Sequence, residues 1–338
     1  MSKKAILLTN LGSPDSTSVK DVRTYLNEFL MDGRVIDIPY LARLLLVRGI
    51  IVPFRAKSSA EKYKSIWTKN GSPLIQISKE LTLAVQAETG LPAYLCMRYA
   101  NPTPASMLKK IKAEHPDLEE LVLLPLYPHF AMSSYETGVL HVQEAHRKGA
   151  YPFQLKVVQP FYNHPDYIAA LAESIQPYLT DTYDQLLFSY HGIPERHIHK
   201  SDPTGNHCLN GLDCCSVPSP AHSTCYRHQV FQTTEAVAKR LNLPKEKYSI
   251  SFQSRLGRDK WLSPSTAQTL QEMPARGIKK TLVVCPAFVS DCLETLEEMN
   301  MEGRETFMQA GGEMYVNIPC LNTNPAWVKA VNTLIQQA

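Results

Sequence analysis

The chain has 338 residues, and at roughly 100 to 200 residues per domain this length predicts two domains or one large one. Its 35 lysine and arginine residues nearly balance 32 aspartate and glutamate residues, and 44% of the residues are hydrophobic. This composition excludes a wholly disordered chain, and the net charge of only +3 argues against nucleic acid as the main partner.

The cysteine content and the N-terminus both indicate a reducing compartment. Eight cysteines in 338 residues are too few for a disulfide scaffold. The N-terminal sequence MSKKAILLTNLGSPD has a shorter apolar run than the roughly 7 to 15 residues of a signal peptide. We therefore expect a cytoplasmic protein.

Short aliphatic runs recur along the chain and predict strands. Most of them lack polar alternation, and helix-like segments such as 78–89, 103–114, 167–179 and 229–241 separate them. This pattern is typical of parallel strands that are buried on both faces, so we expect a doubly wound α/β fold. The eight predicted strands are Ala5–Thr9, Ala93–Met97, Leu121–Tyr127, Leu155–Val158, Leu186–Tyr190, Tyr248–Phe252, Thr281–Cys285 and Met314–Ile318.

The longest apolar stretch, residues 39–54, lies between the first and second predicted strands. Arg43 and Arg48 interrupt it, and it is shorter than the roughly 20 residues that cross a bilayer. It can lie on a membrane surface or form a lip over an apolar ligand. A core helix whose arginine side chains reach solvent is the structural alternative.

The strands fall into two sets of four that correspond in order and in their loops. Asn10-Leu-Gly-Ser-Pro14 follows the first strand, and His191-Gly-Ile-Pro194 follows the fifth. We expect two four-stranded halves over 1–155 and 156–320, with a C-terminal helix over 321–338 that packs back. Because such folds bind ligands at the carboxyl ends of their strands, we expect the active-site cleft between the halves.

His191 is the first candidate for chemistry, because it follows a buried strand and precedes Gly192, which permits close backbone approach. A neutral imidazole at this position can bind a metal or accept a proton near pH 7. The alternative is a histidine that only satisfies a neighbouring carbonyl group.

An acidic segment after the seventh strand is the second candidate. Glu294, Glu298 and Glu302 recur at every fourth residue, which predicts a carboxylate stripe on a helix. Such a stripe can take up protons or pass a divalent cation inward. A solvated acidic face is the alternative, with Leu293, Leu296 and Met299 as the apolar face.

Cationic, aromatic and hydroxyl side chains occur near other strand ends. In this position they suit a flat, unsaturated ligand that carries carboxylates. They are Arg98, Tyr99, Tyr127, Ser133, Ser134, Tyr135, Arg255 and Trp261.

The insertion at residues 207–225 concentrates four cysteines in a loop-like sequence. Thiolates favour zinc or an iron–sulfur cluster. The adjacent pair in the middle does not fit the usual C-x2-C zinc spacing, which favours a 2Fe–2S cluster; zinc and free or disulfide-bonded thiols stay open. The four are Cys208, Cys214, Cys215 and Cys225.

Five motifs in order resemble the ferrochelatase family over nearly the whole chain. They begin at residues 7 (LLTNLGSPDSTSVKDVRTYLNEFLMDGRVIDIP), 125 (PLYPHFAMSSYETG), 189 (SYHGIPERH), 252 (FQSRLGRDKWLSP) and 285 (CPAFVSDCLETLEE). The resemblance implies a lyase that inserts Fe²⁺ into a porphyrin to form haem, with two Rossmann-like halves around the porphyrin.

The resemblance also implies roles for individual residues. His191 and Glu294 would be catalytic, and Glu298 and Glu302 would continue the iron path from these two metal ligands. Porphyrin contacts would come from Leu11, Arg98, Tyr99, Tyr127, Ser134 and Trp261. The internal four-cysteine insertion resembles a smaller bacterial subset of the family that carries a 2Fe–2S cluster.

Departures from the family pattern and the lip refine this interpretation. Many members have histidine where this chain has Cys292, which places a metal-transfer role of that position in doubt. Members that use coproporphyrin tend to have tyrosine at the position of Leu11 and to lack the lip, so we expect protoporphyrin IX and a peripheral membrane contact through 39–54. The alternatives are a coproporphyrin or cobalt chelatase and a non-catalytic haem or porphyrin carrier; monomer and homodimer stay open.

Overall fold

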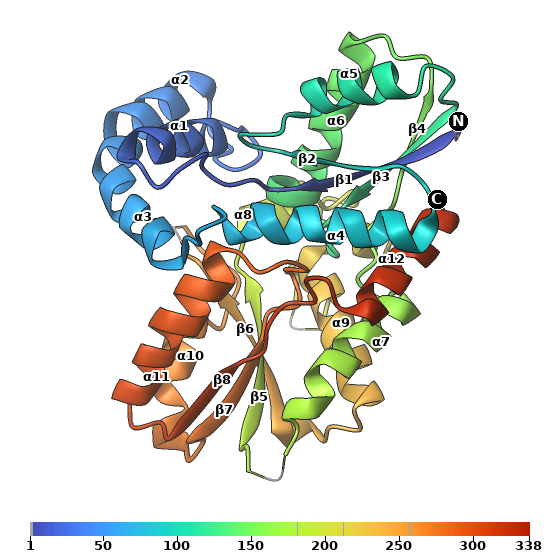
Figure 1. Ribbon diagram of the computed structural model, residues 1–338. Helices are drawn as coiled ribbons and strands as arrows, with labels where there is room; N and C mark the ends of the chain where they lie inside the picture. The colour runs from blue at the N-terminus through green and yellow to red at the C-terminus, as the bar shows by residue number, and fades with distance from the viewer. Residues whose placement is uncertain (1–2, 181, 212, 256, 258) are drawn as a thin grey trace. The chain divides into compact units, whose positions relative to one another are not determined.

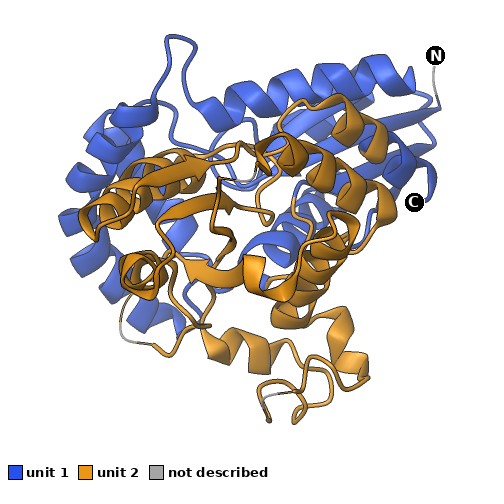
Figure 2. Ribbon diagram, turned by 90° about the horizontal axis from the view of Figure 1, so that it is seen from below, with its two compact units in different colours: residues 1–126, 132–159, 331–338 blue, residues 127–131, 160–330 orange. Residues whose placement is uncertain are grey.

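The structure is a computed structural model that describes residues 3–180, 182–211, 213–255, 257 and 259–338. It contains two compact units (Figure 2). Unit 1 comprises residues 1–126, 132–159 and 331–338, and unit 2 comprises 127–131 and 160–330. Each unit draws on segments that are far apart in the sequence, and the boundaries expected after residues 155 and 320 stay predictions.

Unit 1 is built on a parallel sheet in the order β2-β1-β3-β4. The strands are β1 (Lys4–Asn10), β2 (Ala93–Met97), β3 (Glu120–Pro125) and β4 (Gln154–Val157). The side chains of Ala5 to Leu8 are fully buried, as the unbroken apolar run predicts for a strand covered on both faces. Figure 1 shows α4 (Pro73–Thr89) on one side of this sheet and α5 (Pro104–Glu114) and α6 (Thr137–Lys148) on the other.

Local sequence signals set the ends of these helices. The hydroxyl of Thr103 accepts a hydrogen bond from the backbone of Ser106 and caps α5, whose first residue is a proline. Gly90 ends α4 in the left-handed conformation, which costs glycine little. Ser18 caps α1 (Val19–Leu30) in the same way as Thr103 caps α5.

The apolar stretch 39–54, for which we keep the name lip, is exposed along much of its length and is not a core helix. It comprises α2 (Tyr40–Leu44), the π-helical turn η1 (Leu45–Ile51) and the start of α3 (Val52–Ile66). Among the described residues, no helix is long and apolar enough to cross a membrane. The lip exposes large apolar side chains, with relative exposures of 59% for Tyr40, 71% for Leu41, 72% for Leu45, 56% for Ile50 and 80% for Phe54.

Unit 2 repeats the strand order of unit 1, as β6-β5-β7-β8. The strands are β5 (Gln185–His191), β6 (Tyr248–Gln253), β7 (Lys280–Val284) and β8 (Met314–Asn317), and every pairing is parallel. In Figure 1, α7 (Pro165–Ile175) and α9 (Tyr226–Arg240) lie on one side of the sheet, with α10 (Thr266–Glu272) and α11 (Arg304–Gln309) on the other. The expected strands, their parallel pairing and the internal repeat are therefore confirmed.

The acidic segment departs from the α-helix that its spacing predicts. Residues Glu294–Gly303 form the π-helix η7, with i→i+5 hydrogen bonding, directly before α11. The carboxylate spacing does not distinguish the two helix types, since residues four apart stay on neighbouring positions in both. Of the predicted apolar face, Met299 is buried in the unit 2 core, whereas Leu293 and Leu296 are only partly buried.

The last helix, α12 (Pro325–Gln336), begins in unit 2, and residues from 331 onward belong to unit 1. Its Trp327 is fully buried and packs against Phe161 and Tyr167, with ring centroids 5.6 and 6.0 Å apart. Burial of an aromatic side chain of this size is worth at least about 1.5–3 kcal/mol. This aromatic group anchors the helix that the sequence predicts within 321–338.

Candidate active site

His191 is the last residue of β5, and its ring is only partly buried. Its Nδ1 lies 2.6 Å from the carbonyl oxygen of Gly192. Because a carbonyl can only accept, Nδ1 carries the proton and Nε2 carries the lone pair. The ring packs edge-on against Phe288, with the centroids 6.2 Å apart. The imidazole is thus held as the tautomer that can accept a proton or bind a metal through Nε2.

Gly192 allows this turn because its backbone lies close to the neighbouring strand. A Cβ atom there would lie 2.7 Å from the carbonyl oxygen of Gln253, a contact that real Cβ atoms do not make. Trp261 comes next to the same glycine, with its Cε3 atom at 3.4 Å from that Cβ position. The glycine therefore brings His191, Gln253 and Trp261 together at the carboxyl ends of β5 and β6.

Glu298 is the acid that the structure connects to His191. Its two carboxylate oxygens accept hydrogen bonds from the backbone N–H and the hydroxyl of Ser254, at 2.8 and 2.5 Å. Burial raises the pKa of Glu298, whereas the Ser254 hydrogen bond and the nearby His191 ring act to lower it; the net shift is upward. Ser254 holds this position with φ of +66°, a conformation that costs a non-glycine residue roughly 1–2 kcal/mol. Sequence reasoning missed Ser254.

Glu294 opens η7 beside Cys292. The Cys292 thiol is buried, and burial together with the charge of Glu294, to which it hydrogen-bonds, raises the thiol pKa well above its usual range. Cys292 is therefore a neutral donor to the carboxylate. The backbone carbonyl of Glu294 accepts a weak hydrogen bond from Gln253, at 3.5 Å.

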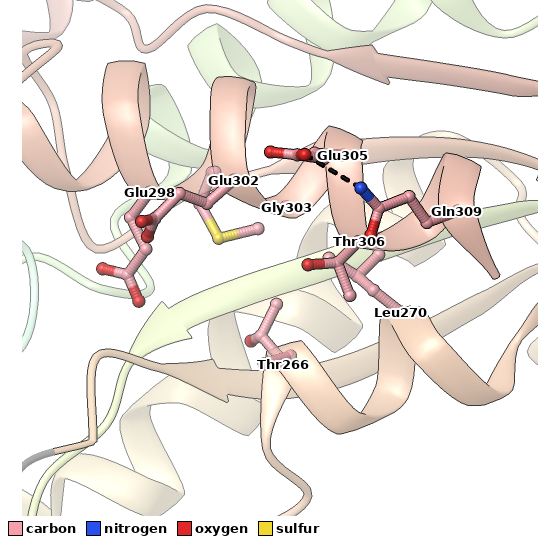
Figure 3. Close-up of a pocket in the computed structure, with 10 residues that line it drawn as sticks. Thr266, Leu270, Glu298, Glu302, Gly303, Glu305, Thr306 and Gln309 are labelled. Atoms are coloured by element: carbon pink, nitrogen blue, oxygen red, sulfur yellow. Dashed lines mark hydrogen bonds between the residues drawn. The ribbon is translucent and has the colours of Figure 1, made fainter. Parts of the chain in front are cut away.

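Glu298 and Glu302 line a cavity of about 380 Å³ that also reaches Glu305 on α11. Figure 3 shows Glu298 and Glu302 at one end of it and Gln309 and Leu270 at the other. Glu302 is exposed, whereas Glu298 is only partly exposed. The predicted carboxylate stripe therefore has Glu302 at its solvent-exposed end and Glu298 further inside. Glu305, which hydrogen-bonds to Gln309 at 2.9 Å, was not among the predicted site residues.

Asp291, three residues before Glu294, acts as an internal anchor. Its carboxylate accepts hydrogen bonds from Thr295 Oγ1 at 2.8 Å and from Asn322 Nδ2 at 2.7 Å. Asn322 in turn accepts from the Asp291 backbone N–H at 2.8 Å. These bonds tie the start of η7 to the loop after β8.

In unit 1, the predicted porphyrin contacts Arg98 and Tyr99 lie in a polar network around Asp32. The guanidinium donates to Asp32 at 2.5 Å, to Thr137 Oγ1 at 2.6 Å and to His141 Nδ1 at 2.7 Å. Burial acts to raise the pKa of Asp32, but hydrogen bonds from Thr137 and the Arg34 backbone and the charge of Arg98 outweigh it, so the pKa is lowered. The Arg98 charge is thus already balanced within unit 1, and Asp32 went unpredicted.

The other predicted contacts lie at loops that follow strands. Leu11 is partly buried directly after β1, and Ser134 is partly buried on the π-helical segment η2 (Met132–Glu136). Tyr99 is fully buried, and Tyr127, which belongs to unit 2, is 8% exposed. Arg255 donates to the carbonyl of Leu262 at 3.2 Å. Whether any of them contacts a porphyrin stays a prediction.

The four cysteines of the insertion lie together as a buried thiol group. The sulfur atoms of Cys214 and Cys215 are 4.0 Å apart, and Cys225 hydrogen-bonds to both Cys208 and Cys215. Among the described residues, no set of three or more His, Cys, Asp or Glu side chains is arranged to hold a metal ion. In the structure, the sulfur atoms contact one another and accept hydrogen bonds from Arg227 and from the backbone N–H of His228.

Several groups outside the thiol group hold this loop in shape. The buried Asp202 carboxylate accepts from the backbone N–H groups of His207 and Cys208, both at 2.8 Å. Burial acts to raise the pKa of Asp202, but these bonds and those from Thr204 lower it below its usual range. No local sequence pattern predicts the role of Asp202, because its partners lie in irregular backbone.

Comparison with known proteins decides the family. The ferrochelatase family model matches residues 3–338. The chain belongs to the ferrochelatase family. It is 52% identical to the ferrochelatase of Opitutus terrae over 331 residues, which cover 97% of this chain and 95% of that protein. It is 48% identical to the ferrochelatase of Pseudomonas syringae pv. tomato over 339 residues, which cover 100% and 99%. The predicted enzyme class, a metal chelatase of the lyase type, is confirmed.

Solved structures support the fold of a ferrochelatase family member. The structure of SirB from Bacillus subtilis with Fe³⁺ has a TM-score of 0.58 at 10% identity and covers 99% of this chain and 95% of its own. A sirohydrochlorin chelatase SirB in complex with cobalt gives a TM-score of 0.57 at 9% identity. At these identities the likeness concerns the fold alone, which is that of a chelatase with two Rossmann-like halves.

Proposed function

We propose that this member of the ferrochelatase family inserts Fe²⁺ into protoporphyrin IX, with His191 as proton acceptor and metal ligand. The supporting observation is the tautomer of His191, which the carbonyl of Gly192 fixes so that Nε2 keeps its lone pair. Glu298 lies close enough for the ring to affect its pKa. His191, as a proton acceptor, and Glu298, as a carboxylate ligand for the cation, therefore lie near each other at the carboxyl end of β5.

The reaction exchanges two pyrrole protons for one Fe²⁺ ion, so total charge is conserved. A planar porphyrin points its N–H groups into its own centre, and iron cannot enter until the ring is bent. Strain of about 1–5 kcal/mol, drawn from binding elsewhere on the ligand, is the usual scale of such distortion. Trp261, which lies beside Gly192, would supply part of that binding. Nε2 of His191 would receive one pyrrole proton from the bent ring, and a carboxylate of the Glu294–Glu298–Glu302 stripe would receive the other.

Iron reaches this point along Glu302, Glu298 and Glu294, in our proposal. The exposed Glu302 and the partly buried Glu298 line the same end of the cavity of about 380 Å³. Carboxylate oxygens can replace the water ligands that Fe²⁺ loses on entry. Burial disfavours the charged form of Glu298, and an arriving cation reverses that preference.

The predicted porphyrin contacts fall into two groups, of which only one is proposed to touch the macrocycle. Leu11, Tyr127 and Ser134 are proposed to contact the macrocycle or its substituents. Arg98 and Tyr99 are proposed to shape the wall behind it, because Asp32 balances the arginine and the tyrosine is fully buried.

An anaerobic assay tests the reaction and the porphyrin together. Purified protein is mixed with Fe²⁺ and either protoporphyrin IX or coproporphyrin, and haem formation is followed by absorbance. We expect multiple turnovers with protoporphyrin IX. Turnover only with coproporphyrin would contradict the substrate assignment, and tight haem binding without turnover would indicate a carrier.

We propose further that the lip, residues 39–54, rests on a membrane surface. Its exposed apolar side chains, such as Leu41 and Phe54, would enter the interface, and the exposed Arg48 would meet lipid phosphates. Flotation with phospholipid vesicles tests this proposal. Phe54→Ser should reduce vesicle binding several-fold, whereas Leu83→Ser, at an exposed site on α4, should not. Equal binding of both variants and the wild type would contradict it.

We also propose that Cys208, Cys214, Cys215 and Cys225 hold a 2Fe–2S cluster. The residues fit such a group in number, in thiol chemistry and in burial, with exposures between 2% and 6%. A bound cluster would supply one-electron redox capacity, which metal insertion does not require. Iron and sulfide analysis with visible spectroscopy tests the proposal: Cys214→Ser should lose both elements and the absorption. Stoichiometric zinc in the wild type would contradict it.

A further inference from the structure

Arg227 places a positive charge against the buried thiol group. Its Nη1 atom lies 3.5 Å from the sulfur of Cys214 and 3.7 Å from that of Cys215. The guanidinium carbon also lies 5.0 Å from the centre of the Phe231 ring, one turn further along α9. Two independent contacts therefore fix the guanidinium, so that it points at both sulfurs rather than into solvent.

The start of α9 adds a second source of positive potential. Cys225 is the N-cap of this 15-residue helix, and its sulfur accepts from the backbone N–H of His228 at 3.5 Å. The N-terminus of a helix favours negative charge. The sulfur of Cys225 therefore lies where the dipole of α9 favours negative charge.

The surrounding histidines hold the backbone of the cysteine pair. His207 donates from Nε2 to the carbonyl of Cys214, and His228 donates from Nδ1 to that of Cys215, both at 2.7 Å. The ring of His222 stacks on that of His228, with the centroids 3.6 Å apart. A substitution of Arg227 therefore leaves the backbone supports of Cys214 and Cys215 in place.

We propose that Arg227 sets the reduction potential of the iron–sulfur cluster on these four cysteines, an inference that rests on the cluster proposal above. One-electron reduction adds one negative charge to a cluster whose ligands are already four thiolates. A fixed cation in contact with two of the sulfurs stabilises the reduced form more than the oxidised form, which raises the potential. Hydrogen bonds to cluster sulfurs act in the same direction.

A redox titration of the purified protein tests this role. Dithionite supplies the electron, mediators set the potential, and visible and electron paramagnetic resonance spectra report the reduced fraction. In Arg227→Gln we expect a lower midpoint potential, with the oxidised-to-reduced ratio at a fixed potential increased about tenfold, equivalent to about 59 mV for one electron. Iron and sulfide content should match the wild type.

Arg240→Gln is the matched control, because it makes the same charge change on the same helix. It lies 13 residues further along α9, or about 20 Å at 1.5 Å per residue. This distance exceeds the Debye length of about 8 Å at physiological ionic strength, so salt screens the charge from the cluster. We expect its midpoint potential to equal that of the wild type. If the midpoint potential of Arg240→Gln shifted as much as that of Arg227→Gln, the effect of Arg227 could not be assigned to its contact with the two sulfur atoms.

The outcomes separate the inference from the proposal on which it rests. Wild-type protein without iron and sulfide would overturn both. A fully loaded Arg227→Gln variant with an unchanged potential would overturn only the role of Arg227. If Arg227→Gln does not retain the cluster, Arg227→Met decides, because it removes the same charge and keeps an apolar contact with Phe231. A lower midpoint potential in this variant supports the role, and an unchanged one contradicts it.

Discussion

The two units share one strand order but differ in whether the polar side chains at corresponding positions are satisfied by neighbouring groups. At the end of β1, Asn10 is buried, and its side chain is satisfied by Ser78 and by the backbone of Leu11. At the end of β5, the corresponding His191 is only partly buried and keeps the lone pair of Nε2. The same backbone position is thus structural in one unit and chemically competent in the other.

The carboxylates show the same contrast. Asp32 in unit 1 is paired with Arg98, and its pKa is lowered. Glu298 in unit 2 accepts hydrogen bonds from Ser254 and lies near the His191 ring, but burial outweighs these contacts and its pKa is raised. A doubled fold can therefore keep its architecture while corresponding regions of its two copies balance their carboxylates differently, and perturbed groups of this kind mark functional sites.

The largest expected effect tests the contrast between His191 and Asn10. His191→Ala should reduce metal insertion by about 10²–10⁴-fold, the usual loss for a general base, while porphyrin binding stays within about tenfold. Asn10→Ala should leave the rate constant of insertion within a fewfold, because Asn10 only satisfies its neighbours. Anaerobic kinetics and porphyrin fluorescence quenching measure both quantities. Near-wild-type activity of His191→Ala would place the chemistry elsewhere.

A second substitution tests the balanced charge in unit 1. Arg98→Met leaves the buried Asp32 without its cation, which should lower the free energy of unfolding by about 3–5 kcal/mol. The side chains of this pair are 14% and 5% exposed. The control is Arg34→Met, which breaks the pair with Glu136, whose side chains are 42% and 33% exposed, and should cost about 0–1 kcal/mol. Urea unfolding measures both; equal losses would show that Arg98 is not a structural residue.

The sequence was informative wherever the signal was local. The eight strands and His191 follow from short apolar runs and from what comes directly after them. The pairing of Asp32 with Arg98 joins residues 66 positions apart, and no periodicity connects them. The π-helical form of η7 was hidden because residues four apart lie close together in either helix type. Ser254 was not predicted because its role depends on a positive φ, and a serine in the sequence does not indicate that conformation.

The smallest expected effect is the pH dependence of stability, and its sign separates the two units. A carboxyl group whose pKa is raised on folding stabilises the protein below its unfolded pKa and loses that contribution as the pH rises through the folded value. Relative to Glu298→Gln, the wild type should therefore lose stability as the pH rises from below 4.5, the ordinary pKa of this group.

Asp32→Asn should show the opposite sign, because the pKa of Asp32 is lowered on folding. Its contribution is present above the ordinary value of 3.8 and is lost as the pH falls, so the wild type should gain stability over Asp32→Asn as the pH rises. Urea unfolding between pH 3 and pH 7 measures both differences. Slopes of the same sign for Asp32 and Glu298 would mean that the two units do not differ in how they stabilise a carboxylate. The proposal that Glu298 receives the iron would then lose the support of its raised pKa.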